Sequence, residues 1–206
     1  MVLYGTYTSP FVRKVRLALH FTGLAKNVEF RLVETNPTIP NLNYAQKNPL
    51  MRVPALELEN GMILADSKLI CRYLDELSPN TILPTGHDKW RVESRHFLAD
   101  GALDSAVLIR YEEALRPKEK LWPEWIKGQE EKIRKTLSFL QGYLDEMKDR
   151  YYLDSLALHC LLGYLKFRGI CKSWEEDFPK LADYYTTNEK KEAFCQTAPD
   201  YAQRGS

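Results

Sequence analysis

The stretch VLYGTYTSPFVRKVRLAL, residues 2–19, joins a strand pattern to a helix pattern with almost no loop between them. Residues 2–7 are rich in the β-branched and aromatic residues that favour strands. Ser9 and Pro10 stand where an N-cap and a first helical residue are expected. Residues 10–24 have the spacing of a helix, with four apolar side chains on one face: Phe11, Val15, Ala18 and Leu19. Gly23 is expected to close this helix.

The following residues continue this alternation of strands and helices. Residues 28–34 alternate apolar and polar side chains, which predicts a second strand. Residues 36–49 are rich in Pro and Asn and are typical of a loop with one helical turn. Residues 53–65 then predict a hairpin of two strands around the turn pair Asn60-Gly61.

A further helix opens at Asp66-Ser67, and its expected buried face holds Leu69, Ile70, Tyr73, Leu74 and Leu77. The predicted order is β-α-β-(α)-β-β-α, with the first two strands parallel and the last two antiparallel. This α/β domain covers residues 1–78. The linker-like composition of residues 79–86 separates it from residues 87–206.

Residues 87–206 carry helical patterns throughout, which predicts an all-helical bundle domain. A long pattern covers residues 88–115, and WPEW at residues 122–125 is interpreted as a break. Residues 128–149 show the spacing of a bundle helix, with apolar side chains at Ile133, Leu137, Leu140, Leu144 and Met147. Residues 155–167, SLALHCLLGYLKF, are apolar nearly all round, so we expect them at the centre of the bundle.

Composition excludes several classes of function. The 206 residues carry a formal net charge of +1, which gives no long-range attraction to nucleic acid or anionic membranes. No apolar run reaches the roughly 20 residues of a membrane span, and the N-terminus lacks the order of a signal peptide. The four cysteines form no C-x-x-C pair and are expected as buried thiols rather than disulfides or zinc ligands. We therefore expect a cytoplasmic protein without a metal.

Ser9 admits two interpretations. It is an ordinary N-cap, or its hydroxyl and the exposed N–H groups of the helix start form an anion site. Arg13, Lys14 and Arg16 lie in the first turns, where the helix dipole disfavours each cation by roughly 0.3–1 kcal/mol. A bound anion would offset that cost, and surface ion pairs would explain the cations equally well.

Two other stretches also allow an ordinary and a functional interpretation. In NPLMRVPAL, residues 48–56, Pro54 starts an edge strand with a trans bond, or a cis bond turns the Val53 backbone outward toward a peptide-like ligand. In ADSKLI, residues 65–70, Asp66 or Ser67 caps a helix. Alternatively, the acid and the hydroxyl hold the ammonium and carboxylate of an amino acid.

The order of these stretches resembles the glutathione transferases over nearly the whole chain. SPFVRKVRLAL, NPLMRVPAL and ADSKLICRYLDE match the three N-terminal signatures of that family, and EAFCQTAP is similar to its C-terminal ending. Within the family the chain looks most like a bacterial serine-type member, and its S-P-F-V is also similar to the plant tau class. The resemblance implies a thioredoxin-like N-terminal domain followed by an all-α domain, in a homodimer.

The resemblance also implies a binding site for glutathione. Its residues by position are Ser9, Asn36, Arg52, Val53, Pro54, Asp66 and Ser67. Ser9 would contact the thiol, and Val53 would pair through its backbone with the cysteinyl unit beside a cis Pro54. Asp66 and Ser67 would hold the γ-glutamyl end. The glycyl carboxylate would lie near Arg52 and the loop around Asn36.

Glutathione thiolate is then the anion that the helix start would bind. A free thiol titrates near 8.5, and Ser9 with the helix N-terminus would lower that by roughly 1–2 units. The expected activity is detoxifying attack of this thiolate on a small electrophile, or reduction of a peroxide. The alternative is a non-catalytic binding or regulatory protein on the same fold. A thiol-disulfide oxidoreductase would need a cysteine at position 9.

The second substrate is expected between the domains, near Tyr7, Phe11, Asp104, Leu108 and Tyr111, although core packing explains each of these side chains as well. Asp100 and Asp104 lie one turn apart on the helix, so their repulsion calls for either water or a cationic partner, and a basic residue such as Arg95 of a second copy of the chain is a candidate for that partner.

Two positions depart from the family pattern. Met51 replaces a usual Gly, which bears on the loop conformation. Tyr152 and Ser155 replace a Ser-x-x-Asp capping box, where we expect Asp154 to cap instead.

Overall fold

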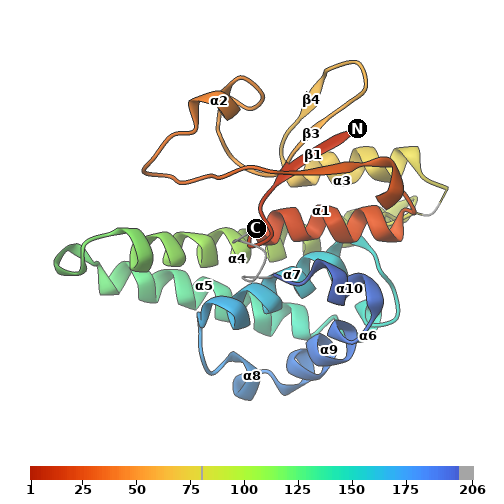
Figure 1. Cartoon of the computed structure of the whole chain (residues 1–206). Coiled ribbons are helices and arrows are strands. Elements are labelled where there is room, and N and C mark those ends of the chain that lie inside the picture. Colours follow the sequence, from red (N-terminus) through yellow and green to blue (C-terminus); the bar gives the residue numbers. More distant parts are fainter. Residues whose placement is uncertain (80, 200–206) are drawn as a thin grey trace. The chain divides into compact units, whose positions relative to one another are not determined.

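The computed structural model describes residues 1–79 and 81–199. The chain divides into two compact units (Figure 1). One contains Met1–Leu83 together with the C-terminal segment that begins at Glu192, and the other contains Pro84–Lys191. The C-terminal segment thus belongs by its contacts to the first unit, and the second unit ends at Lys191.

The first unit is built on a four-stranded sheet in the order β2-β1-β3-β4. The strands are β1 (Val2–Gly5), β2 (Glu29–Leu32), β3 (Ala55–Glu57) and β4 (Ile63–Leu64). β1 pairs with β2 in parallel and with β3 antiparallel, and β3 forms a hairpin with β4. The predicted order of strands and helices along the chain is confirmed, as are the parallel pairing of the first two strands and the hairpin of the last two. The fold is thioredoxin-like.

Helices α1 (Pro10–Phe21) and α3 (Ser67–Leu77) pack against each other, and Figure 1 draws both on one side of the sheet. The close approach of α1 requires Gly5, because a Cβ added there would lie 2.6 Å from a Val12 methyl carbon. A short 3-10 helix (Ala25–Asn27) follows α1. Gly23 has φ 75°, which fits its predicted role at the end of the helix.

The buried face of α3 differs from the predicted one. Ser67, Ile70, Cys71 and Leu74 are buried, whereas Leu69 and Leu77 are 45% and 47% exposed. Leu69 precedes Ile70 by about 100° of helix rotation, so it points away from the sheet.

On the other face of the sheet, Tyr4, Tyr44 and Ala55 form a small buried cluster. Tyr4 and Ala55 are register partners on β1 and β3, so their side chains share a face. Tyr44 comes from the one-turn helix α2 (Leu42–Ala45), which Asn41 caps. This cluster ties the loop around α2 to the sheet.

The C-terminal helix α10 (Glu192–Thr197) packs on α1 within the first unit. Arg13 donates to the Phe194 carbonyl at 3.1 Å, and Arg16 donates to the Gln196 carbonyl at 2.7 Å. These cations therefore bind the carbonyl end of a helix, where the dipole is negative. Their presence near Ser9 is explained without an anion.

The second unit consists of helices. Its long helix α4 (His87–Leu115) packs against α5 (Pro123–Gln141) and α7 (Leu153–Arg168), and α9 (Pro179–Glu189) packs on α7. Three short helices complete it: the 3-10 turn Lys118–Lys120, α6 (Leu144–Met147) and α8 (Trp174–Asp177). The prediction that residues 155–167 are central is confirmed, because α7 is buried from Leu153 to Leu165.

Two predicted helix boundaries in this unit are wrong. Trp122-Pro123 starts α5 rather than breaking it, because Pro123 occupies the first turn, where a missing N–H costs nothing. The helix predicted over residues 128–149 ends at Gln141 and restarts as α6. Its five predicted core residues are nevertheless all buried.

Candidate functional site

Ser9 sits at the N-cap of α1, between the end of β1 and the first turn of the helix. Its hydroxyl oxygen accepts a hydrogen bond from the Val12 N–H at 3.3 Å, so the N-cap interpretation is correct. A serine hydroxyl has one donor hydrogen as well as acceptor lone pairs. Capping uses an acceptor only, and the residue is partly exposed, so the hydrogen remains available to a ligand.

The loop before β3 carries three of the predicted binding residues. The Val53–Pro54 peptide bond is cis, as the resemblance implies. The Arg52 side chain is exposed, and its carbonyl accepts hydrogen bonds from Tyr44 and Asn48. Met51 has φ 52°, in the left-handed region where glycine is usual. The missing glycine therefore leaves a strained residue in the loop.

Asp66 is the N-cap of α3 and Ser67 is its first helical residue. One carboxylate oxygen of Asp66 accepts the N–H groups of Lys68 and Leu69, at 2.9 and 3.2 Å. The capping interpretation is therefore correct, and the second oxygen is left for a cation. The Ala65–Asp66 bond is also cis. Ser67 is buried and Asp66 is exposed.

Asn36 lies in an exposed turn of the same unit. Its side-chain oxygen accepts both the N–H and the hydroxyl of Thr38, at 2.9 and 2.8 Å. This oxygen closes the turn, so the amide NH₂ is the group with which this side chain can donate to a ligand.

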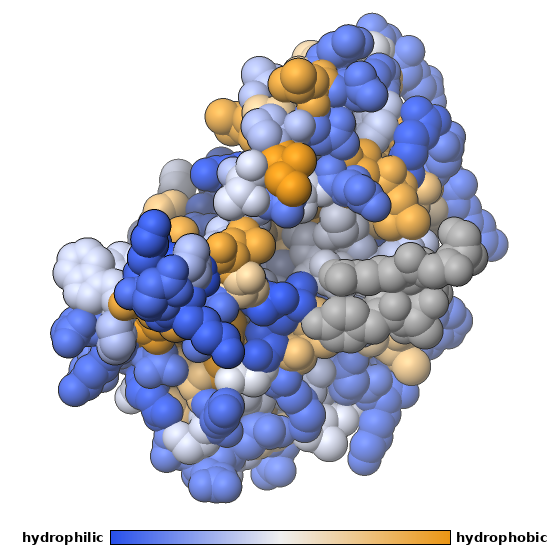
Figure 2. All heavy atoms as spheres, turned by 60° about the vertical axis from the view of Figure 1, so that its left-hand side comes forward, coloured by the Kyte–Doolittle hydropathy of each residue, from blue (hydrophilic) through white to orange (hydrophobic). Residues whose placement is uncertain are grey.

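The five residues predicted around a second substrate fall in different units. Tyr7 packs its ring on Phe30 with the Arg16 guanidinium 5.2 Å from its centre, and Phe11 is partly buried on α1. The other three, on α4, are exposed and share one helix face: Asp104, Leu108 and Tyr111. Figure 2 shows apolar side chains in small patches among hydrophilic ones on the face that it presents. Whether the five residues form one pocket stays a prediction.

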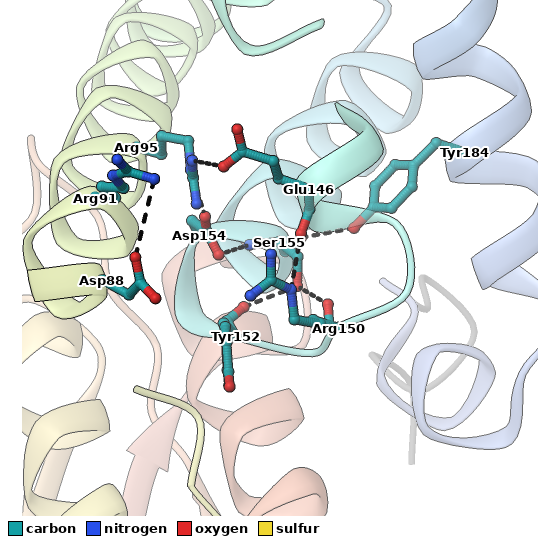
Figure 3. Close-up of polar contacts among 9 residues, drawn as sticks. All are labelled: Asp88, Arg91, Arg95, Glu146, Arg150, Tyr152, Asp154, Ser155 and Tyr184. Atoms are coloured by element: carbon teal, nitrogen blue, oxygen red, sulfur yellow. Dashed lines mark hydrogen bonds and ion pairs between the residues drawn. The ribbon is translucent and has the colours of Figure 1, made fainter. Parts of the chain in front are cut away.

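A cavity of about 180 Å³ lies in the helical unit, and Figure 3 shows its polar side chains. It is lined by Asp88, Arg91, Val92, Arg95, Glu146 and Arg150. Arg95 binds Asp154 at 2.7 Å and Glu146 at 2.8 Å, and Arg91 approaches Asp88 at 3.9 Å. These charges compensate one another, so we assign the cavity no ligand. Arg95 is engaged within its own chain by Asp154 and Glu146, and a bridge from it to a second copy stays a prediction.

Asp154 does not cap α7 in the predicted way. The N-cap residue is Tyr152, which makes no side-chain cap bond. Asp154 lies inside the first turn, where its carboxylate accepts the Ser155 N–H at 2.9 Å as well as binding Arg95. Burial raises the pKa of Asp154, although the Arg95 guanidinium acts against that rise.

Three of the four cysteines are buried as predicted, and Cys195 on α10 is exposed. Burial raises the pKa of the Cys171 thiol to about 11. No helix within residues 1–79 and 81–199 combines the length and apolar character needed to cross a membrane. In that same part of the chain, His, Cys, Asp and Glu side chains nowhere gather in the groups of three that a metal site would need.

Sequence reasoning missed Tyr44 and Asn48, which hold the loop that carries Arg52 and Val53. Asn48 had a signal, because Asn before Pro is a frequent turn starter. Tyr44 had none, since a single tyrosine in a polar loop does not show what its hydroxyl will bind.

Comparison with known proteins agrees with this arrangement. Residues 3–81 match the family model of the glutathione S-transferase N-terminal domain. The chain is 34% identical to the uncharacterized GST-like protein YibF of Escherichia coli, over 98% of this chain and 100% of that protein. It is 29% identical to glutathione S-transferase U1 of Arabidopsis thaliana, over 93% and 85% of the two chains.

Solved structures agree as well. A glutathione transferase family member from Pseudomonas fluorescens Pf-5 with bound glutathione superposes with a TM-score of 0.93 at 38% identity, over 97% of this chain and 98% of that one. A glutathione S-transferase from Methylobacillus flagellatus with bound glutathione gives a TM-score of 0.84 at 31% identity, over 97% and 99%. The chain belongs to the glutathione S-transferase family.

Proposed function

We propose that this protein is a glutathione transferase that binds glutathione in its α/β unit and activates the thiol with Ser9. The observation that carries the proposal is the capping geometry of Ser9. Its oxygen accepts the Val12 N–H at 3.3 Å, which leaves the hydroxyl hydrogen free to donate to a sulfur. Relatives with bound glutathione support the choice of ligand.

The other binding residues follow the extended shape of the tripeptide. The second oxygen of Asp66 binds the α-ammonium of the γ-glutamyl unit, and the Ser67 hydroxyl binds its carboxylate. The backbone of Val53, next to Pro54, pairs with the cysteinyl unit. Arg52 and the Asn36 amide receive the glycyl carboxylate.

The reacting nucleophile is the thiol of glutathione, and the protein orients this thiol and stabilises its negative charge. A thiol with a pKa near 8.5 is only about 3% ionised at pH 7, and lowering that value by about 1–2 units raises the ionised fraction to roughly 25–75%. The thiolate then forms a C–S bond to an electrophilic carbon as the leaving group departs with the bonding electrons. With a hydroperoxide, the sulfur attacks the terminal oxygen, the O–O bond breaks and the alkoxide leaves to become the alcohol, so that glutathione becomes its sulfenic acid. A second glutathione then displaces hydroxide to give the disulfide.

We place the electrophile near Tyr7, Phe11, Asp104, Leu108 and Tyr111, and we expect a cytoplasmic homodimer with a detoxifying role. In this assignment, substitution of Leu108 or Tyr111 changes KM for the electrophile and leaves glutathione affinity unchanged. An affinity for glutathione that moves with these residues would argue against it.

The test is calorimetric glutathione binding to the wild type and to Ser9→Ala, with the thiolate absorbance of bound glutathione titrated against pH. We expect binding by both proteins and a lowered thiol pKa in the wild type only. Ser105→Ala is the matched control, because that hydroxyl donates within its own helix, to the Gly101 carbonyl at 3.2 Å.

Turnover of an aryl halide and of an organic hydroperoxide then separates conjugation from peroxide reduction. Binding without either activity would favour a non-catalytic glutathione-binding protein. If the wild type fails to bind millimolar glutathione, the proposal is wrong.

A further inference from the structure

The carbonyl of Arg52 is held by two buried side chains from the preceding segment. The Tyr44 hydroxyl donates to it at 3.0 Å and the Asn48 amide donates to it at 2.8 Å. Tyr44 and Asn48 are 5% and 4% exposed, so water does not compete for these bonds. Two donors on one carbonyl oxygen use both of its lone pairs.

Asn48 is itself fixed by the turn that it organises. Its N–H donates to the Tyr44 carbonyl at 3.0 Å, and its carbonyl accepts the Met51 N–H at 2.8 Å. Its side-chain oxygen accepts the Leu50 N–H at 3.1 Å. The amide orientation is therefore determined, because the oxygen faces an N–H donor and the NH₂ group faces the Arg52 carbonyl.

Tyr44 is fixed from the other side by the sheet. Its ring lies 5.8 Å from that of Tyr4, in the cluster against which Met51 and Val53 also pack. The hydroxyl of Tyr4 points elsewhere and donates to Glu57 at 2.5 Å. Tyr44 thus connects the core of the sheet to one peptide group of the loop.

That peptide group is the one that carries the Val53 N–H. Cis bonds in residues 1–79 and 81–199 occur at Val53–Pro54 and Ala65–Asp66, so the Arg52–Val53 bond is trans. In a planar trans peptide the C=O and the N–H point in opposite directions. Because the Arg52 carbonyl points at Tyr44 and Asn48, the Val53 N–H points away from them, out of the buried cluster.

We infer that Tyr44 and Asn48 are positioning residues that aim the Val53 N–H at the main-chain carbonyl of a bound γ-glutamyl tripeptide. The inference rests on the proposed function, because glutathione supplies that carbonyl. The two side chains touch no ligand atom. They act by fixing the rotation of one peptide plane before the ligand arrives, which removes an ordering cost from binding.

The test compares glutathione affinity, by calorimetry, among the wild type, Tyr44→Phe, Asn48→Asp and Tyr4→Phe. Tyr44→Phe removes one of the two donors and should weaken binding about three- to tenfold, the range for one neutral hydrogen bond. Asn48→Asp puts a carboxylate oxygen against the Arg52 carbonyl and should weaken binding by more than about tenfold. Tyr4→Phe is the matched control, because it removes a hydroxyl from the same cluster without touching Arg52.

Urea unfolding of each variant separates positioning from stability. We expect Tyr4→Phe to lose stability about as much as Tyr44→Phe while its glutathione affinity stays at the wild-type value. If Tyr4→Phe and Tyr44→Phe lower affinity equally, the effect is general loosening of the cluster and the inference is wrong.

A measurement on the wild type alone avoids any folding defect. In a ¹⁵N-labelled sample, the Val53 amide should shift downfield as glutathione is added, as expected when an N–H gains an acceptor. Glutathione binding without a Val53 response would overturn the inference and leave the proposed function standing. An absence of glutathione binding would overturn both.

Discussion

Arg95 on α4 and Asp154 in the first turn of α7 form a buried ion pair, with Nε 2.7 Å from a carboxylate oxygen. Their side chains are 9% and 2% exposed. Glu146 on α6 binds the same guanidinium at 2.8 Å (Figure 3). The pair lies at the start of α7, where the capping box of the family is missing. It anchors that start to α4.

Breaking this pair from one side should destabilise the protein strongly. Arg95→Ala leaves a buried carboxylate without its partner, and we expect a loss of about 3–5 kcal/mol in the free energy of unfolding. Arg91→Ala is the control, since Arg91 is 67% exposed and should cost less than about 0.5 kcal/mol. Urea unfolding measures both.

Replacing both partners should cost much less than replacing one. Burial raises the pKa of Asp154, which means that the pairing does not fully offset the desolvation of the carboxylate. Arg95→Met with Asp154→Leu should therefore recover most of the loss, because apolar replacements of a buried pair are often neutral. A double variant as unstable as Arg95→Ala would show that the pair itself stabilises the fold.

Met51 permits a test of backbone strain. Met51→Gly and Met51→Ala lose the same packing to within one methyl group, but only glycine adopts φ 52° without strain. We expect the glycine variant to be more stable than the alanine variant by about 1 kcal/mol. At an unstrained position alanine is more stable than glycine. An alanine variant more stable than the glycine variant would therefore contradict backbone strain at Met51.

Ser67 permits a test of the γ-glutamyl end. Ser67→Ala should weaken glutathione binding about tenfold through the loss of a hydrogen bond to a charged group. Ser67→Thr, which keeps the hydroxyl, is the conservative comparison, and calorimetry measures both. Equal affinities in the alanine variant and the wild type would remove Ser67 from the site.

His20 predicts a pH dependence of stability. Burial and the nearby Arg16 lower the pKa of His20 in the folded protein below its ordinary value of 6.5. Between the two pKa values the unfolded chain binds more protons, so stability rises with pH there. The contribution is present above about pH 6.5 and is lost as the pH falls through the lowered pKa.

Urea unfolding at pH 7.5 and pH 5.0 tests this, with His20→Gln as the variant. The glutamine variant should lose less stability between the two pH values than the wild type. If the two proteins lose the same amount, His20 does not titrate with a lowered pKa.

Thiol accessibility gives a further prediction. Iodoacetamide should modify Cys195 in the folded protein, because it is the exposed thiol among Cys71, Cys160, Cys171 and Cys195. Cys171 should resist labelling at neutral pH, since burial raises the pKa of its thiol to about 11 and only thiolate reacts. Mass spectrometry of peptides after timed labelling, with a urea-unfolded control, locates the label. Early labelling of Cys171 would contradict its burial.

The sequence by itself determined the parts of the fold that depend on local order. Ser9-Pro10 predicts a strand passing into a helix, Asn60-Gly61 predicts the hairpin, and the spacing from Ile133 to Met147 predicts buried positions. Each depends on residues a few positions apart, where turn chemistry and period act directly. The capping roles of Ser9 and Asp66 also depend on residues only two or three positions away.

Only the tertiary structure decided which partners distant residues take. Arg13 and Arg16 bind carbonyls about 180 positions away, and Arg95 binds Asp154 on another helix of its own chain. The direction of the Val53 N–H depends on the hydrogen bonds that Tyr44 and Asn48 donate to the Arg52 carbonyl. A side chain's hydrogen-bonding groups are known from sequence, but which acceptor comes within 3 Å of them depends on how the whole chain packs.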